Sequence, residues 1–251
     1  MMKRGSLQMK AVFLADAHLK NANDRGYRDL MHFLDVLPEV DRFFIAGDFF
    51  DFWFCREGRV YPEFAPIIEK LIKLKQRGIH IVFCEGNHDF SMGSFFSDKL
   101  GMTVYAERAD IDMDGRTILV SHGDTVDQTN RKYLLLRRIL RSTPFFHFQR
   151  VIPLPLLWRL ARISSMTSKE LSPEMENLIA AKMEIFSQEK FKEGFDAVIL
   201  GHCHKPLIKE YVAEGRKRTF VTLGDWIKYR SYLFYENGHF TLKDFSNPVT
   251  S

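Results

Sequence analysis

The sequence is poor in cysteine and has no long apolar run. Its three cysteines, Cys55, Cys84 and Cys203, are an odd number without a Cys-x-x-Cys pair, which argues against a disulfide framework and favours a reducing compartment. No apolar run approaches the roughly 18 residues of a membrane-spanning helix. The apolar run at 11–15, after a basic start, is too short for a signal peptide. We therefore expect a cytoplasmic protein.

Acidic residues are missing from one stretch of the chain. Residues 128–169 contain no Asp or Glu, although the 251 residues include 32 acidic and 36 Lys or Arg side chains. The stretch holds nine basic residues, namely Arg131, Lys132, Arg137, Arg138, Arg141, Arg150, Arg159, Arg162 and Lys169. A basic segment of this kind favours an anionic partner over a purely solvated face.

The apolar content of 45% and the length exclude a disordered chain and fit one large domain with an insertion. Short apolar runs that end in polar motifs predict buried strands at 11–15, 43–46, 79–84, 117–120 and 197–200. A helix is predicted by the apolar spacing at 62–76. Further strands are predicted at 220–223, 232–235 and 239–242, with an Asn-Gly hairpin turn between the last two. Together these elements predict an α/β fold with mixed sheets.

Residues 128–194 interrupt this rhythm and show only helical patterns. Apolar and basic arcs alternate at 130–141, a second helix is expected at 155–163, and Ser172-Pro173 begins a third that Gly194 ends. We expect a core made of 10–127 and 195–246, with 128–194 as a helical insert above it.

Five predicted strands end in residues that bind metals. The motifs are Asp16-x-His18, Gly47-Asp48-x-x-Asp51, Gly86-Asn87-His88-Asp89, His122-Gly123 and Gly201-His202-x-His204. Ligands bind at the carboxyl ends of strands in α/β sheets, and oxygen ligands mixed with imidazoles suit Mn²⁺, Fe, Zn²⁺ or Mg²⁺. One such motif is weak evidence, but the ordered set of five predicts a metal centre. Divalent cations there would offset the charge of a phosphate substrate and lower the pKa of water.

This ordered set resembles the calcineurin-like metallophosphoesterase superfamily over nearly the whole chain. The resemblance implies a four-layer sandwich, with two mixed β-sheets flanked by helices, that holds two divalent metal ions. It implies that Asp48 bridges the two ions. It assigns one ion to Asp16, His18, Asp48 and His204, and the other to Asp48, Asn87, His122 and His202.

A narrower resemblance is to the UDP-2,3-diacylglucosamine diphosphatases of lipid A synthesis. The motifs that carry it are Asp48-Phe-Phe-Asp51-Phe-Trp53, Asn87-His88-Asp89-Phe90, Gly101-Met102-Thr103, His122-Gly123-Asp124-Thr125 and Ser168-Lys169-Glu170. It implies Mn²⁺-dependent hydrolysis of the lipid-linked UDP-sugar to UMP and a lipid 1-phosphate, with the insert as a lid, at the anionic inner membrane surface. The residues expected to bind the substrate are Trp53, Tyr133, Arg137, Ser168 and Lys169, with Arg162 in place of the lid arginine that is Ser165 in this chain.

The sequence departs from that narrower pattern at three positions. His88, Ser165 and Met175 stand where the diphosphatases have Arg, Arg and Lys. We expect His88 to protonate the leaving group or stabilise charge on phosphorus, with Asp89 orienting it; the alternative is a histidine that only supports a turn.

Other interpretations stay open at this point. Cys203, between two predicted ligands, should face away from the metals and pack, Asp51 should act behind the ligands, and Asp225 suits a turn. Phe49, Phe50, Phe52, Trp53 and Phe54 suit either core packing or an apolar pocket wall. The alternative functions are hydrolysis of another nucleotide anhydride or phosphodiester, and a non-catalytic scaffold. We expect no nucleic-acid partner, and the oligomeric state stays undetermined.

Overall fold

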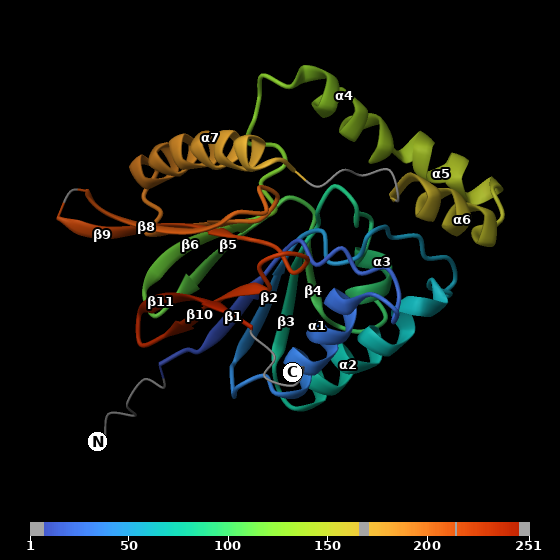
Figure 1. The fold of residues 1–251 in the computed structure, drawn as a ribbon, viewed down its shortest axis with the longest axis horizontal. Coiled ribbons are helices and arrows are strands. Elements are labelled where there is room, and N and C mark those ends of the chain that lie inside the picture. Colours follow the sequence, from blue (N-terminus) through green and yellow to red (C-terminus); the bar gives the residue numbers. More distant parts are fainter. Residues whose placement is uncertain (1–7, 166–170, 214, 246–251) are drawn as a thin grey trace.

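The computed structural model describes residues 8–165, 171–213 and 215–245 and has four layers. Helices α1 (Arg25–Asp35) and α2 (Ala65–Gln76) cover the outer face of a six-stranded sheet (Figure 1). This sheet packs on a five-stranded sheet, and α7 (Pro173–Lys192) covers the far face of the second sheet. The predicted sandwich of two mixed sheets flanked by helices is confirmed. None of the described helices combines the length and apolar character that crossing a membrane requires.

The first sheet has the strand order β11-β10-β1-β2-β3-β4. Strands β1 to β4 run parallel, and β10 pairs antiparallel with both β1 and β11. The C-terminal hairpin therefore lies beside the first strand of the chain. The strands are β1 (Ala11–Leu14), β2 (Arg42–Ala46), β3 (His80–Cys84), β4 (Thr103–Tyr105), β10 (Ser231–Glu236) and β11 (His239–Asp244).

The second sheet has the strand order β5-β6-β7-β9-β8. Strands β6, β7 and β9 run parallel to one another, and the edge strands β5 and β8 are antiparallel to their neighbours. The strands are β5 (Arg108–Met113), β6 (Arg116–Ser121), β7 (Ala197–Leu200), β8 (Pro206–Ala213) and β9 (Arg216–Leu223).

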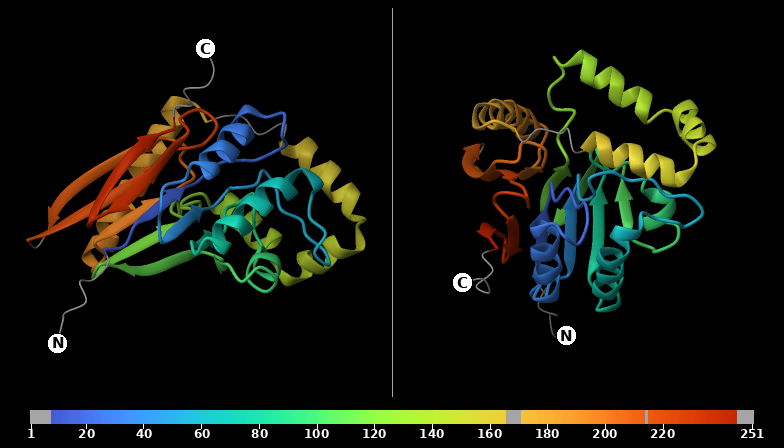
Figure 2. Two further views of the ribbon diagram at one scale, coloured as in Figure 1. Left: turned by 90° about the horizontal axis from the view of Figure 1, so that it is seen from below. Right: turned by 45° about the vertical axis from the view of Figure 1, so that its right-hand side comes forward.

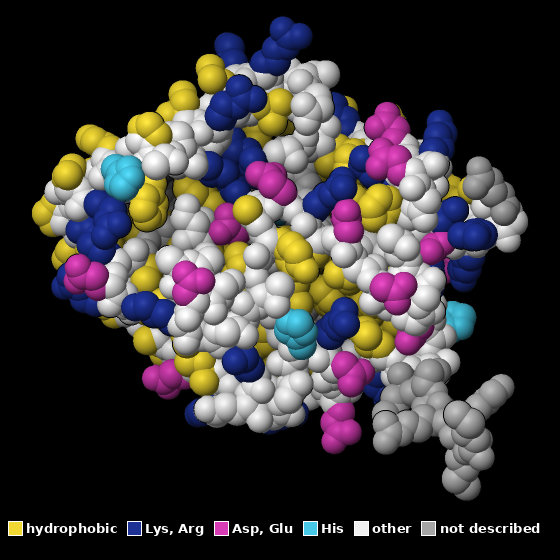
Figure 3. Space-filling model, turned by 180° about the vertical axis from the view of Figure 1, so that it is seen from behind, with side chains coloured by type: hydrophobic (Ala, Val, Ile, Leu, Met, Phe, Trp, Pro, Cys, Tyr) yellow, Lys and Arg dark blue, Asp and Glu magenta, His cyan; other side chains and the backbone are white. Residues whose placement is uncertain are grey.

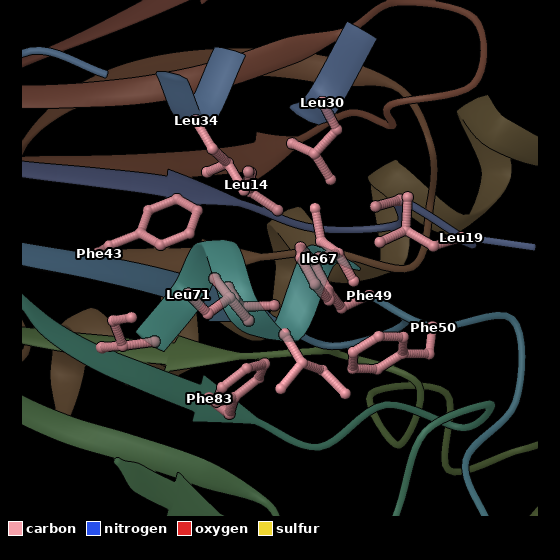
Figure 4. Packing of buried hydrophobic residues seen from close by; sticks show 14 of the residues in the cluster. Leu14, Leu19, Leu30, Leu34, Phe43, Phe49, Phe50, Ile67, Leu71 and Phe83 are labelled. Atoms are coloured by element: carbon pink, nitrogen blue, oxygen red, sulfur yellow. The ribbon is translucent and has the colours of Figure 1, made fainter. Parts of the chain in front are cut away.

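Alternation along the strands divides the core into layers. Val12 and Leu14 face α1 (Arg25–Asp35) and α2 (Ala65–Gln76), as Figure 4 shows for the packing of that layer. Phe13, between them in sequence, faces the second sheet and stacks on Phe44 with ring centroids 4.5 Å apart. A 3-10 turn, η1 (Pro62–Phe64), leads into α2, and the short helix α3 (Gly93–Phe96) precedes β4.

The predicted insert divides into two parts. Helices α4 (Arg131–Leu140), α5 (Thr143–Val151) and α6 (Leu154–Ser165) extend beyond the sandwich (Figure 2). Helix α7 (Pro173–Lys192), capped by Ser172, instead buries Ala180, Met183 and Phe191 against the second sheet. The insert expected at 128–194 therefore contains two parts: the three outlying helices, and α7, which is a layer of the sandwich. The sequence did not separate them, because the helical pattern of α7 does not show which element it packs against.

Candidate metal centre

Five of the seven predicted metal ligands have a left-handed backbone. The φ angles are 53° at Asp16, 43° at His18, 51° at Asp48, 65° at His202 and 59° at His204. Residues other than glycine rarely adopt positive φ, and such strain gathers at functional sites. Each of the five follows a strand of one of the two sheets, so the strain coincides with the place where β1, β2 and β7 end.

The first group of side chains gathers around Asp16. The Nε2 atom of His204 lies 3.4 Å from Asp16 Oδ1, and the Nε2 atom of His18 lies 3.9 Å from the same oxygen. His18 Nε2 is also 3.7 Å from Asp48 Oδ2. Two atoms that bind one ion at about 2.1 Å must lie within roughly 4.2 Å of each other, and these distances satisfy that limit.

The second group gathers on the other side of Asp48. His122 Nε2 lies 3.4 Å from Asp48 Oδ2 and 3.0 Å from Asn87 Oδ1. The other ring nitrogen of His122 lies 3.1 Å from the carbonyl oxygen of Ala46, which leaves Nε2 to face the site. The ring of His202 packs edge-on against that of His122, with centroids 5.0 Å apart. The fold therefore brings all seven predicted ligands together, with Asp48 between the two groups.

Unpartnered polar atoms point into this site. Within the described residues, Asp16 Oδ1 and His18 Nε2 are buried and have no hydrogen-bond partner. Buried polar atoms are nearly always paired, and those left over call for an ion or water. Groups made of Asp16, His18 and His204, and of Asp16, Asp48 and His122, each hold their ligand atoms within 4.8 Å of one another. The residues thus fit divalent cations.

The two aspartates titrate in opposite directions. Burial raises the pKa of Asp16 to about 6, although the charge of His204 opposes the shift. Burial would also raise the pKa of Asp48, but the charges of His122 and His88 hold that carboxyl well below its usual range. Asp48 therefore stays ionised between the two groups, as a bridging ligand must.

The histidines separate in the same way. Burial lowers the pKa of His18 to about 3 and that of His202 to about 4, where the charge of His122 adds to the effect. Against the effect of burial, the charge of Asp48 and a hydrogen bond to it raise the pKa of His122 to about 10. Asp16 and Asp225 likewise raise the pKa of His204 to about 9. Without metal, protons on His122 and His204 balance the buried aspartates.

His88 lies at the edge of the first group. Its ring packs edge-on against His18 with centroids 4.8 Å apart, and its Nδ1 is 3.0 Å from the carbonyl oxygen of Asp51. A ligand atom of His88 also lies within 4.8 Å of ligand atoms of His18 and Asp48. His88 therefore lies beside the first group of predicted ligands, close to His18 and Asp48.

Asp89 does something other than orient His88. Its two carboxylate oxygens accept hydrogen bonds from the backbone N–H groups of Asp48, Phe49, Phe50 and Gly86, at 2.7–3.1 Å. Asp89 thus fixes the loop that carries Asp48.

Two aspartates support the ligands from behind. Asp225 Oδ2 lies 3.3 Å from Nδ1 of His204, while its Oδ1 accepts hydrogen bonds from the N–H groups of Lys228 and Tyr229. The predicted turn is therefore present, and the contact with His204 is an addition that the sequence did not reveal. Asp51 Oδ1 is 3.9 Å from Nδ1 of His18.

Cys203 packs away from the metal side. It is buried beneath α7 and its thiol lies 3.5 Å from the carbonyl oxygen of Lys205. Burial raises the pKa of the thiol to about 11. The prediction that this cysteine packs is confirmed.

Basic residues of α4 contact acidic groups of the core. Arg137 donates to Asp124 at 2.6 Å and, through two nitrogens, to both carboxylate oxygens of Glu107. Tyr133 donates to Asp124 at 2.6 Å. Arg141 donates to the Gly86 carbonyl at 2.6 Å and to Glu85 at 3.2 Å. The side chains of one helix face thus hold the loops that carry Asn87 and His122.

The remaining predicted substrate residues lie in different surroundings. Trp53 is buried among core aromatic rings and also lines a cavity, so both expected roles of the aromatic block are present. Arg162 is exposed on α6. Ser168 and Lys169 lie outside the described residues.

The cavity beside Trp53 lies under the insert and has a mixed lining of aromatic, aliphatic and charged side chains. It has a volume of about 230 Å³ and extends from Phe54 and Phe90 to Phe146, Leu154 and Leu157 of α5 and α6. Phe90, in its wall, directly follows the Asn87-His88-Asp89 motif in the chain.

The two sheets of this α/β sandwich bring carboxylates and imidazoles together at their strand ends. This arrangement is typical of a metal-dependent phosphohydrolase. A family model of calcineurin-like phosphoesterases matches residues 9–206. The chain belongs to this family and is a metallophosphoesterase.

The chain is similar over most of its length to relatives with named functions. A UDP-2,3-diacylglucosamine hydrolase of Aeromonas salmonicida (strain A449) is 30% identical over 96% of this chain and 95% of that protein. Enzymes of the same name from Cellvibrio japonicus (strain Ueda107) and Stutzerimonas stutzeri (strain A1501) are 30% and 27% identical, over 87% and 86% of this chain and 91% and 90% of theirs. The similarity thus spans the insert as well as the core.

Proposed function

We propose that this protein hydrolyses the diphosphate of UDP-2,3-diacylglucosamine to UMP and 2,3-diacylglucosamine 1-phosphate. The observation that carries the proposal is the cavity of about 230 Å³ under α5 and α6, part of whose wall is formed by Phe54, Phe90, Phe146, Leu154 and Leu157. Acyl chains need apolar walls, and these aromatic and aliphatic side chains supply them. The relatives' names state the same substrate.

Two divalent ions complete this site. Asp16, His18, Asp48 and His204 would hold one ion, and Asp48, Asn87, His122 and His202 the other, with Mn²⁺ favoured over Fe, Zn²⁺ and Mg²⁺. When bound, the pair supplies positive charge for the phosphates and lowers the pKa of water. Apart from His88 and Asp89, the chain contributes neutral imidazoles from His18 and His202, whose pKa values lie below neutrality.

His88 would deliver the proton. Its Nδ1 is engaged by the Asp51 carbonyl, so Nε2 is the nitrogen that faces the substrate, and a proton there passes to the oxygen of the leaving phosphate. Asp89 acts indirectly, since it holds the loop of Asp48.

The insert would act as a lid that meets a membrane. We propose that α4, α5 and α6 form this lid and that α7 does not. More than half of the surface of Leu135, Leu136, Phe148, Val151, Leu160 and Ile163 is exposed, among the basic residues of the insert. Figure 3 shows hydrophobic side chains beside Lys and Arg at its upper left, where the insert lies in that view. Apolar surface mixed with basic charge binds anionic lipid surfaces, which supports a place at the cytoplasmic face of the inner membrane.

A comparison of two substrates tests the acyl requirement. Enzyme loaded with Mn²⁺ should hydrolyse UDP-2,3-diacylglucosamine far faster than UDP-N-acetylglucosamine, and chelation should abolish both activities. Equal rates would remove the lipid from the proposal and leave a phosphohydrolase of another nucleotide anhydride or diester. Complete inactivity of protein that holds two ions would favour a scaffold.

Vesicle flotation tests the membrane contact separately. Arg131→Glu with Arg138→Glu changes two exposed residues of α4 and should release the protein from vesicles that contain anionic phosphatidylglycerol. Neutral phosphatidylcholine vesicles are the control. Binding that the double substitution leaves unchanged would show that charge on α4 does not hold the lipid.

A further inference from the structure

A second cavity lies between the loop after β6 and α7, apart from the cavity under α5 and α6. It has a volume of about 170 Å³ and is enclosed by the loop after β6, the start of α4 and the inner side of α7. His202, a predicted ligand, forms part of its wall, and Asp124, two residues after His122, forms another part. The cavity therefore opens beside the second group of ligands.

The two cavities, as the structure describes them, share no lining residue. The first follows the loop after β2, residues 90–99 and helices α5 and α6, whereas the second follows residues 123–133 and α7. A substrate whose phosphates lie on the metal centre can therefore extend in two directions. The second cavity is the smaller of the two and has a predicted ligand, His202, in its wall, which suits the nucleoside end of the substrate rather than two acyl chains.

The lining of the second cavity suits a flat ring with polar edges. Leu178 and Ile179 of α7 and the ring of Tyr133 offer apolar surface to the faces of such a ring. Asn130 uses its carbonyl oxygen to cap α4, which leaves two amide N–H donors, and Lys182 offers an ammonium beside Asp127. Donors and a carboxylate along one edge match the two carbonyl oxygens and the N–H of a pyrimidine such as uracil.

The size of the cavity points to one small ring. Whole drug-sized ligands occupy about 300–1,000 Å³, so a cavity of about 170 Å³ holds only a fragment of a substrate. A pyrimidine fits this description better than a purine. Part of the wall is adjustable, since about half of the surface of Leu178 and Met175 is exposed.

We propose that this second cavity binds the pyrimidine nucleoside of the substrate, while the cavity under α5 and α6 holds the lipid end. The inference deepens the proposed function and rests on it for the identity of the substrate. The contacts that carry it are the walls supplied by Tyr133 and α7 and the direct continuity with His202.

Calorimetric binding of UMP, ribose 5-phosphate and AMP to the full chain loaded with Mn²⁺ tests this assignment. The three probes share the phosphate, so differences among them report on the base. UMP should bind roughly ten-fold more tightly than ribose 5-phosphate, because its base is enclosed against Tyr133, and AMP should gain much less. Equal affinities for UMP and ribose 5-phosphate, or for UMP and AMP, would overturn the proposal.

Tryptophan substitutions locate the base. Leu178→Trp, and as a second variant Met175→Trp, should fill the cavity and remove the ten-fold preference for UMP. Ile185→Trp is the matched control, because Ile185 is an exposed aliphatic residue of the same helix that does not line the cavity. Metal content and melting temperature confirm that each variant is folded and loaded. A preference that survives both cavity substitutions would place the base elsewhere.

The assay separates this inference from the substrate proposal. A preference for UMP that depends on Leu178, in an enzyme that does not require acyl chains, would refute the lipid substrate and leave the nucleoside site standing. Strict dependence on acyl chains with no preference for UMP would have the opposite meaning.

Discussion

Asp225 and His204 form a pair in which the carboxylate contacts the imidazole from behind. Asp225 Oδ2 lies 3.3 Å from Nδ1 of His204, and the opposite nitrogen of the ring lies 3.4 Å from Asp16 Oδ1. Both side chains come from loops that follow strands of the second sheet. Carboxylates in this position fix the ring orientation of metal-binding histidines and raise their basicity.

Asp225→Asn should weaken Mn²⁺ binding roughly 10- to 100-fold. The amide keeps the size of the side chain but removes the charge that orients His204, so the metal affinity should fall while the fold persists. Titration of the metal-free protein with Mn²⁺ measures the change, and Asp98→Asn, at an exposed position, is the control. An unaltered affinity for Mn²⁺ would show that Asp225 only stabilises the turn and does not orient His204.

Asp48→Asn should lower the metal content from two ions to at most one. Asp48 lies between the two ligand groups, 3.7 Å from His18 Nε2 and 3.4 Å from His122 Nε2, and an amide cannot bridge two cations as a carboxylate does. Hydrolysis of an aryl phosphodiester should fall at least ~100-fold. Elemental analysis of the purified variant measures the content, and two retained ions would contradict the bridging role.

Metal binding at pH 7 should release about two protons, one each from His122 and His204. Their pKa values of about 10 and about 9 mean that both rings are protonated in the metal-free protein, and each must lose a proton to bind an ion. The apparent affinity should therefore rise with pH, less steeply above about 9, and level off above about 10. Calorimetry in buffers of different ionisation enthalpy counts the protons, and release of none would show that the rings are neutral beforehand.

Arg141→Ala should destabilise the protein by about 1–3 kcal/mol, because it leaves the buried Glu85 carboxylate without its cation. Urea unfolding measures the change in the free energy of unfolding. Arg138→Ala, at an exposed position of the same helix, should change it little. Faster proteolysis of the insert in Arg141→Ala alone is expected, since Arg141 also holds the Gly86 and Ala106 carbonyls. Equal behaviour of the two variants would show that this anchor is dispensable.

Gly86→Ala should damage the metal centre directly. A methyl group at residue 86 would overlap the carboxylate and backbone nitrogen of Asp48, whereas one at Gly93 meets nothing within 4 Å. We expect Gly86→Ala to lose about 1–3 kcal/mol of stability and part of its bound metal, with Gly93→Ala as the matched control. Melting curves and metal content of both variants provide the measurement, and parallel results would refute this close contact.

The predicted ligands could be identified in the sequence because each follows a buried strand in a short motif. The edge strands β5 and β8 could not be predicted. β5 reads Arg-Ala-Asp-Ile-Asp-Met and buries only Ala109 and Met113, and β8 has no fully buried residue, so neither shows the apolar run of a central strand. Helix α1 was missed as well, although Asp24 caps it, because its apolar residues stand among charged ones.

Contacts between segments that are distant in the chain could also not be predicted from the sequence. The basic residues of the insert could be counted, but the acids that pair with Arg137 and Arg141 lie in the core, at Asp124, Glu107 and Glu85. A local sequence pattern shows that a residue is charged, but it does not show which distant residue pairs with that charge. For the same reason Asp225 could be placed in a turn but not behind His204.

The position of β1 between β2 and β10 has a consequence for synthesis. Asp16 follows β1, and its carbonyl accepts a hydrogen bond from the N–H of Trp226 at 3.1 Å, in the segment that leads to β10. A nascent chain on the ribosome can therefore not close the first ligand loop until the C-terminal hairpin has left the exit tunnel. A message truncated before residue 226 would yield a polypeptide with every ligand present and the scaffold around Asp16 unfinished, a target for cellular proteases.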